Sequence, residues 1–312
     1  MMQKLSKLTA LIGLALGASL VQADTGKLLL TGGVSTIAGS AGGGLSPWAV
    51  IGSNATEGEV GLSAYASRAT TQDYSLNSYG LAVGIHDRIE LSVAQQDFDA
   101  SPAVALNGIA PFGIAAGQHI QMDVLGVKVK VAGDAILNSD SWMPQISVGL
   151  EYKAVRPGSL QSVFDFMGVK NNGTDFYVSA TKLLLAKSLL LNGTLRSTNA
   201  NQGGLLGFGA GSTGTSSRSV VPEFAVAYLL NKKLAIGAEY RVMTNNLESV
   251  GSAAGLVNAA LHADDWKDIF VAWAPSKNVS LTLAYVDLGQ VVPGVTAGRR
   301  QTGTYLSAQF AF

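Results

Sequence analysis

Tyr305-Leu306-Ser307-Ala308-Gln309-Phe310-Ala311-Phe312 ends the chain, and the residues of this stretch alternate between two characters. Successive side chains of a β-strand point to opposite faces. One face would carry Leu306, Ala308, Phe310 and Phe312, and the other would carry Tyr305, Ser307, Gln309 and Ala311. The stretch therefore predicts a final strand with one apolar face that stops at an aromatic residue.

Such an ending resembles the closing strand of bacterial outer-membrane β-barrels, in which a terminal Phe belongs to the recognition signal for insertion. The resemblance implies the outer membrane of a Gram-negative bacterium as the location. It also implies a partner, the barrel-assembly machinery, which would bind the strand ending at Phe312.

The start of the chain predicts export. Lys4 and Lys7 form a basic start, Leu8 to Leu16 is apolar, and Val21-Gln22-Ala23 offers small residues for a signal peptidase. This order is typical of a secretory signal peptide, here residues 1–23, whose apolar part is too short for a permanent membrane helix. We expect the mature chain to begin at Asp24.

The composition excludes several classes of protein. Charged residues make up 13% of the chain, about half of the usual 25%. The absence of cysteine excludes a disulfide scaffold. Without Lys4 and Lys7, 19 basic residues face 21 acidic ones, so nothing predicts nucleic acid as a partner.

Strict alternation recurs along the mature chain. In residues 145–153, for example, Ile146, Val148, Leu150 and Tyr152 alternate with small or polar residues. About twelve such segments occur, which predicts an all-β, antiparallel transmembrane β-barrel of about twelve strands. Fourteen strands remain an alternative if the N-terminal segment adds a hairpin.

A soluble β-sandwich has one apolar face too, but two features favour the membrane barrel. The polar face is mostly Ser, Thr, Ala, Gly and Gln, with few charges. The connections also alternate in length, as short periplasmic turns and long outer loops do. Short turns are expected at 86–88, 186–188, 230–233 and 275–278, and long loops around 99–118, 154–173, 199–219, 242–265 and 288–302; the turn at 132–144 is longer than this rule expects.

Aromatic residues are expected in two girdles at the headgroup levels of the membrane. With both termini in the periplasm, the outer girdle would hold Tyr79, Tyr152, Phe176, Tyr240 and Tyr285, and the inner girdle Tyr228, Trp273 and Phe312.

One segment changes the phase of its alternation. Apolar residues are even-numbered from Ile120 to Val124 and odd-numbered from Leu125 onward. This shift, with Gly126 at the change, predicts a β-bulge there.

The N-terminal part of the mature chain differs from the rest. Residues 26–52 are rich in glycine, which permits tight turns and close approach of the backbone. The segment 24–57 could be a mobile leader, an extra hairpin or a plug inside the lumen of a barrel formed by 58–312.

Several of these runs resemble one family. Gly26 to Ser35, Ala41 to Gly52, Tyr79 to Gly84 and Asp87 to Ser92 are similar to an uncharacterised, domain-of-unknown-function family of Gram-negative outer-membrane β-barrel proteins. The similarity extends over nearly the whole mature chain. It implies the barrel and its location, and it brings no catalytic or binding residues.

Charged residues within the strands are the best candidates for a functional site, since charge facing lipid is costly. They could form a salt-bridged interior or a constriction that filters solutes by charge. The candidates for the lumen, or for strand ends that flank it, are Glu90, Asp123, Glu151, Lys153, Asp175, Lys182, Arg196, Glu223, Glu239, Arg241 and Lys267.

No catalytic constellation, cofactor motif or metal-ligand spacing is visible, so we expect no enzyme. The sequence favours an outer-membrane barrel that is a passive narrow channel for small solutes, in contact with membrane lipid and lipopolysaccharide. The alternatives are a non-conducting structural or adhesive barrel with ligand-binding outer loops, and an uptake channel for hydrophobic compounds gated by the N-terminal segment.

Overall fold

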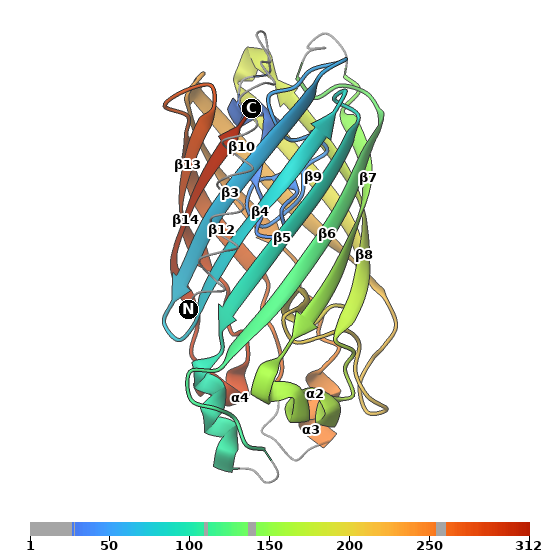
Figure 1. The fold of residues 1–312 in the computed structure, drawn as a ribbon, viewed down its shortest axis with the longest axis vertical. Coiled ribbons are helices and arrows are strands. Elements are labelled where there is room, and N and C mark those ends of the chain that lie inside the picture. Colours follow the sequence, from blue (N-terminus) through green and yellow to red (C-terminus); the bar gives the residue numbers. More distant parts are fainter. Residues whose placement is uncertain (1–26, 28, 109–111, 137–141, 254–259) are drawn as a thin grey trace.

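The fold is one closed barrel. The computed structural model describes Lys27 and residues 29–108, 112–136, 142–253 and 260–312, so the predicted signal peptide lies outside the described residues. Twelve antiparallel strands, β3 to β14, pair in sequence order, and β14 pairs with β3 to close the barrel (Figure 1). The predicted twelve-stranded barrel is confirmed. The alternative of fourteen strands is wrong, because the two-residue strands β1 (Val34–Ser35) and β2 (Ala41–Gly42) pair only with each other.

The barrel strands have the following bounds: β3 Val60–Thr71, β4 Ser75–Ile85, β5 Ile89–Asp99, β6 His119–Ala132, β7 Gln145–Arg156, β8 Asn172–Leu184, β9 Leu189–Thr198, β10 Ser219–Asn231, β11 Leu234–Arg241, β12 Trp266–Trp273, β13 Val279–Asp287 and β14 Thr302–Ala311. The α-helices are α2 (Gln161–Met167), α3 (Glu248–Ala253) and α4 (Pro293–Thr296). Short 3-10 helices are η1 (Leu29–Gly32), η2 (Ser101–Gly108), η3 (Gly158–Leu160), η4 (Leu185–Lys187) and η5 (Gln202–Gly204).

Each barrel strand has an inner face toward the lumen and an outer face. In β12, Asp268 and Phe270 are buried inside, whereas Ile269 and Val271 are exposed outside. Exposed Leu, Val, Ile and aromatic side chains cover the outer face of the other strands in the same way. A closed barrel with an apolar exterior is the arrangement of a transmembrane barrel. None of the described helices is both long and apolar enough to span a membrane.

The two ends of the barrel differ. The short turns lie at one end of the barrel, where β6 also ends and β7 begins. The long connections that contain α2, α3 and α4 lie at the other end (Figure 1). One connection at the loop end, 72–74, is short as well. We call these the turn end and the loop end.

The predicted girdle residues all lie in the outward phase of their strands, and most are strongly exposed. Near the turn end lie Tyr228, Trp273 and Phe312, and in the loop-end half of their strands lie Tyr79, Tyr152, Phe176, Tyr240 and Tyr285.

The β-bulge expected at Gly126 is a wrong prediction. Strands β5 and β6 stay in register through Gly126, and β6 shifts against β7 only between Lys130 and Ala132. The sequence changes phase because Ile120, Met122 and Val124 face inward, each 1% exposed. The loop end of the lumen is thus apolar at this strand, whereas the turn end carries the inward-facing Lys128.

The N-terminal segment lies inside the barrel. From Leu29 to Ala55 almost every residue is buried, and the segment occupies the half of the lumen near the turn end (Figure 1). We call residues 29–55 the plug. It leads into β3 at Val60.

Candidate lumen site

Two carboxylates of the barrel wall bind the backbone of the plug. Glu90 on β5 accepts hydrogen bonds from the Ala41 amide at 3.1 Å and the Gly52 amide at 2.7 Å. Glu239 on β11 accepts from the Leu45 amide at 2.8 Å and from the Ser46 hydroxyl at 2.6 Å. Hydrogen bonds from amides to a carboxylate are charge-assisted and strong. The plug is therefore fixed at two separate points of the wall.

Other inner side chains bind carbonyl groups of the plug. The Lys128 ammonium lies 3.0 Å from Glu90 and donates to the Val50 carbonyl at 2.9 Å. Gln96 donates to the Ile37 carbonyl at 2.8 Å, and Thr194 donates to the Pro47 carbonyl at 2.8 Å. Polar side chains of the inner face thus supply hydrogen-bond partners to the irregular backbone of the plug, which forms few hydrogen bonds within itself.

Glycine permits the close approach of the plug to Glu239. A Cβ atom at Gly43 would lie 2.2 Å from the Oε1 atom of Glu239, which is closer than any real contact. A side chain at this position would displace the Glu239 carboxylate from the plug backbone.

A salt-bridged belt of charges crosses one side of the lumen on the loop-end side of the plug. Arg196 on β9 binds Glu151 at 2.8 Å and Glu223 at 2.6 Å. Lys153 binds Asp175 at 2.7 Å, and Arg241 lies 3.4 Å from Glu223. We call these six residues on β7 to β11 the charged belt; their side chains are at most 7% exposed. Buried charges of both signs that neutralise one another hold the wall together but form no ring of one sign.

Of the eleven candidate residues, eight lie on the inner face: Glu90, Glu151, Lys153, Asp175, Arg196, Glu223, Glu239 and Arg241. The interpretation of Asp123, Lys182 and Lys267 as lumen residues is corrected, because all three lie in the outward phase of their strands. Near strand ends a charge can reach water and a partner: Asp123 pairs with Arg156, Lys267 lies 3.5 Å from Asp287, and Lys182 donates to the Asp134 carbonyl at 3.2 Å.

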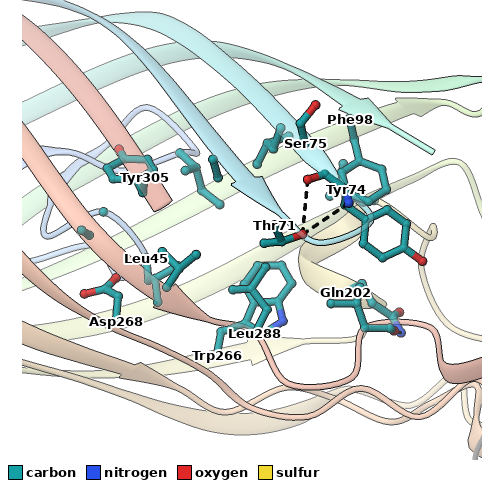
Figure 2. Close-up of a pocket in the computed structure, with 18 of the residues that line it drawn as sticks. Leu45, Thr71, Tyr74, Ser75, Phe98, Gln202, Trp266, Asp268, Leu288 and Tyr305 are labelled. Carbon is teal, nitrogen blue, oxygen red and sulfur yellow. Dashed lines mark hydrogen bonds between the residues drawn. The ribbon is translucent and has the colours of Figure 1, made fainter. Parts of the chain in front are cut away.

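An apolar cavity lies in the part of the lumen that the charged belt does not occupy, against the strands on the other side of the barrel. Strands β3, β4 and β12 to β14 line it with side chains such as Leu76, Phe270 and Val286. Ile37 and Leu45 of the plug line it as well, and Figure 2 shows Leu45 at its inner end. We call it the inner cavity.

A second apolar cavity lies under the long loops. Phe112, Leu160, Phe164 and Met167 line this outer cavity, together with residues of the loop around α4. Four side chains line both cavities, namely Tyr74, Phe98, Leu206 and Val292. The two cavities therefore adjoin at these four side chains between the loop end and the plug, and we call the pair the apolar route.

Tyr74 stands where the two cavities meet, in the connection between β3 and β4 (Figure 2). Burial and the neighbouring Asp73 carboxylate raise the pKa of its hydroxyl. The ring therefore stays uncharged at neutral pH and adds apolar surface to the route.

Asp268 is an inner-face acid that is not among the eleven candidates. Its place in the inward phase of β12, two residues after Trp266, is the signal that identifies it. Among the described residues no cluster of His, Asp and Glu could hold a metal ion.

Solved barrel structures resemble the chain at low sequence identity. A structure titled "KdgM porin in complex with disordered oligogalacturonate" has a TM-score of 0.48 and 8% identity, and covers 80% of this chain and 99% of its own. One titled "NanC porin structure in rhombohedral crystal form" has 0.47 and 10%, with 80% and 98% covered. Omp33 of Acinetobacter baumannii has 0.39 and 9%, with 80% and 97% covered. At these values the likeness says nothing of a solute.

The sequence itself identifies a family. No curated protein matches the chain. A family model matches residues 31–309, which include the plug from Thr31 onward and nearly the whole barrel. The predicted resemblance to an uncharacterised family is confirmed: the chain belongs to the family described as "Protein of unknown function (DUF3034)".

Proposed function

We propose that this protein is an outer-membrane barrel that takes up small apolar compounds from outside, and that the plug gates their passage. The observation that carries the proposal is the apolar route that ends on Ile37 and Leu45 of the plug. Binding sites for small compounds are concave and mostly apolar.

The contacts of the plug suit a gate. Its amide and carbonyl groups form hydrogen bonds with side chains of the wall. The plug does not join the sheet of the barrel strands. Water can take the place of these partners when the plug moves, and none of these hydrogen bonds holds two barrel strands together. A compound that pushes against Leu45 and Ile37 could shift the plug while the strands of the barrel stay paired. A passive narrow channel, the simplest function the sequence favours, would require a lumen that the plug leaves open.

The cavity is tested by filling it. Ala284 faces the inner cavity from β13 and is 3% exposed. We expect Ala284→Trp to weaken saturable binding of radiolabelled 1-decanol to the protein in nanodiscs about tenfold, a loss of about 1.4 kcal/mol.

Leu283→Trp is the matched control, because the preceding residue of the same strand points outward and is 54% exposed. Equal binding by the two variants, or no saturable binding by the parent protein, would reject the apolar uptake function. Saturable binding by the outer loops alone would favour the adhesive barrel.

The proposed location gives a second prediction. Phe312 follows the last residue of β14, and its backbone still bonds with β3: its amide donates to the Leu62 carbonyl at 2.8 Å, and its carbonyl accepts from the Leu62 amide at 2.9 Å. Phe312→Ala keeps these backbone bonds and removes the ring that the assembly machinery would recognise. We expect several-fold less heat-modifiable protein in the outer-membrane fraction, where lipid and lipopolysaccharide would surround the barrel.

Phe310→Ala serves as the control, because Phe310 is an exposed ring on the same face of the same strand. An equal loss for both variants would argue against recognition of the terminal residue. Recovery of the parent protein from the soluble periplasm would overturn the location itself.

A further inference from the structure

Asp268 places an acid without a cation in the wall of the inner cavity. The residue is 8% exposed, and its Oδ1 atom has no hydrogen-bond partner in the described part of the chain. In Figure 2 its carboxyl group lies near Leu45 of the plug, at the inner end of the cavity. A buried, unpaired carboxylate is costly, so a partner from outside the chain would be favourable.

The charges on the inner face leave an acidic excess. Apart from the turn-end group of Lys27, Asp87, Lys130 and Asp134, which pair among themselves, six acids stand against four bases among the described residues. The acids are Glu90, Glu151, Asp175, Glu223, Glu239 and Asp268, and the bases are Lys128, Lys153, Arg196 and Arg241. The lumen therefore carries a formal excess of two negative charges.

Two neighbouring acids account for the negative excess. Glu239 and Asp268 lie opposite each other on β11 and β12, and neither forms a salt bridge within the described chain, whereas each of the other four acids does. The plug amides satisfy Glu239. Asp268 is thus the acid that remains available to a compound in the inner cavity.

We infer that the compound taken up by the inner cavity is an apolar amine, seated with its ammonium group at Asp268 and its apolar body along Phe270, Val286 and Leu288. This inference rests on the proposed uptake of apolar compounds. The ammonium group would supply the missing cation, and the apolar walls would bury the rest of the compound. The Trp266 indole N–H also lacks an acceptor, so an oxygen close to the amine would find a donor.

The test compares three compounds with the same tail. Decylamine, 1-decanol and decanoate are titrated against the full-length protein in nanodiscs, with protein-free nanodiscs as the blank for partition into lipid. We expect decylamine to bind about tenfold more tightly than decanol and decanoate to bind most weakly, since a charge-assisted hydrogen bond is stronger than a neutral one.

Asp268→Asn keeps the shape of the side chain and removes its charge. We expect this variant to lose the preference for decylamine over decanol. Asp287→Asn, on the outer face where Asp287 pairs with Arg300 at 2.6 Å, should keep the preference. Heat-modifiable mobility of both variants reports whether the barrel is folded.

The outcomes separate the two levels of the proposal. If none of the compounds binds saturably, the apolar uptake function itself fails. If decanol binds as tightly as decylamine, or if Asp268→Asn keeps the preference, uptake stands and the assignment of an amine at Asp268 is overturned.

Discussion

Deleting residues 29–55 is expected to raise the single-channel conductance of the protein in planar bilayers at least about tenfold. A barrel of twelve strands lies between the small barrels that side chains fill and the large ones that hold an aqueous channel. Here the plug, buried from Leu29 to Ala55, occupies the half of the lumen at the turn end. Without it, Ser, Thr, Gln and Glu side chains of the wall would face water in place of the plug backbone.

The barrel should survive this deletion. Strand β3 begins at Val60, after the plug, and its pairing with β14 closes the barrel without any plug residue. Glu90 keeps Lys128 as a partner at 3.0 Å, and Glu239 would become hydrated. The charged belt stays in place and sets the upper limit of the current. An unchanged conductance of a folded deletion variant would show that the plug does not gate the pore.

A single substitution offers a gentler version of the experiment. Gly43→Val forces a side chain into the Glu239 carboxylate, because even a Cβ atom would lie 2.2 Å from it. We expect frequent openings of this variant instead of a permanently open pore. Gly193→Val is the matched control, since a Cβ atom at Gly193 meets nothing within 4 Å. Equal traces for the two variants would argue against Glu239 as an anchor of the plug.

The sequence predicted the barrel because its strands are regular. In a membrane barrel the outer face must be apolar at every second residue, so a segment such as 145–153 carries its orientation in its own alternation. The turn and loop lengths then indicate which strand ends lie on the same side of the membrane. Local rules of this kind need no knowledge of distant contacts.

The contents of the lumen were harder to predict. Inward charge can be inferred where apolar neighbours mark the outer face, as for Glu151 and Arg196. At strand ends the inference fails, because a charge such as Asp123 or Lys267 can lie on the outer face and still reach water and a partner. The glycines indicate a plug as one alternative. Its anchors, however, are contacts between residues far apart in the sequence, such as the hydrogen bond from the Leu45 amide to Glu239.

One departure from the regular alternation was misinterpreted. Ile120, Met122 and Val124 break the apolar phase of β6 because they face the lumen, not because the strand bulges. All three belong to a cluster of buried apolar side chains, and Ile120 also lines the outer cavity. Asp268 is hard to assign for another reason. Its strand begins at Trp266, directly after a long loop, so few strand residues precede Asp268 to show which face it lies on.

Replacing Arg196 with Met is expected to lower the free energy of unfolding by about 3–5 kcal/mol, because it breaks a buried ionic network on one side only. Arg196 is 1% exposed and binds Glu151, Asp175 and Glu223 from three neighbouring strands. Lys153 can still neutralise Asp175 at 2.7 Å. Glu223, however, would keep only Arg241 at 3.4 Å, so an acid that has almost no contact with water loses its closest cation.

The measurement is urea unfolding in lipid vesicles, followed by loss of heat-modifiable mobility. Arg156→Met is the control, because Arg156 pairs with Asp123 on the outer wall with side chains 49% and 42% exposed, and such a pair contributes less than about 1 kcal/mol. Adding Glu223→Gln to Arg196→Met should restore part of the loss, since it removes the stranded charge. Equal stability of Arg196→Met and Arg156→Met would mean that water reaches the charged belt, and the belt would then belong to an open pore instead of a closed wall.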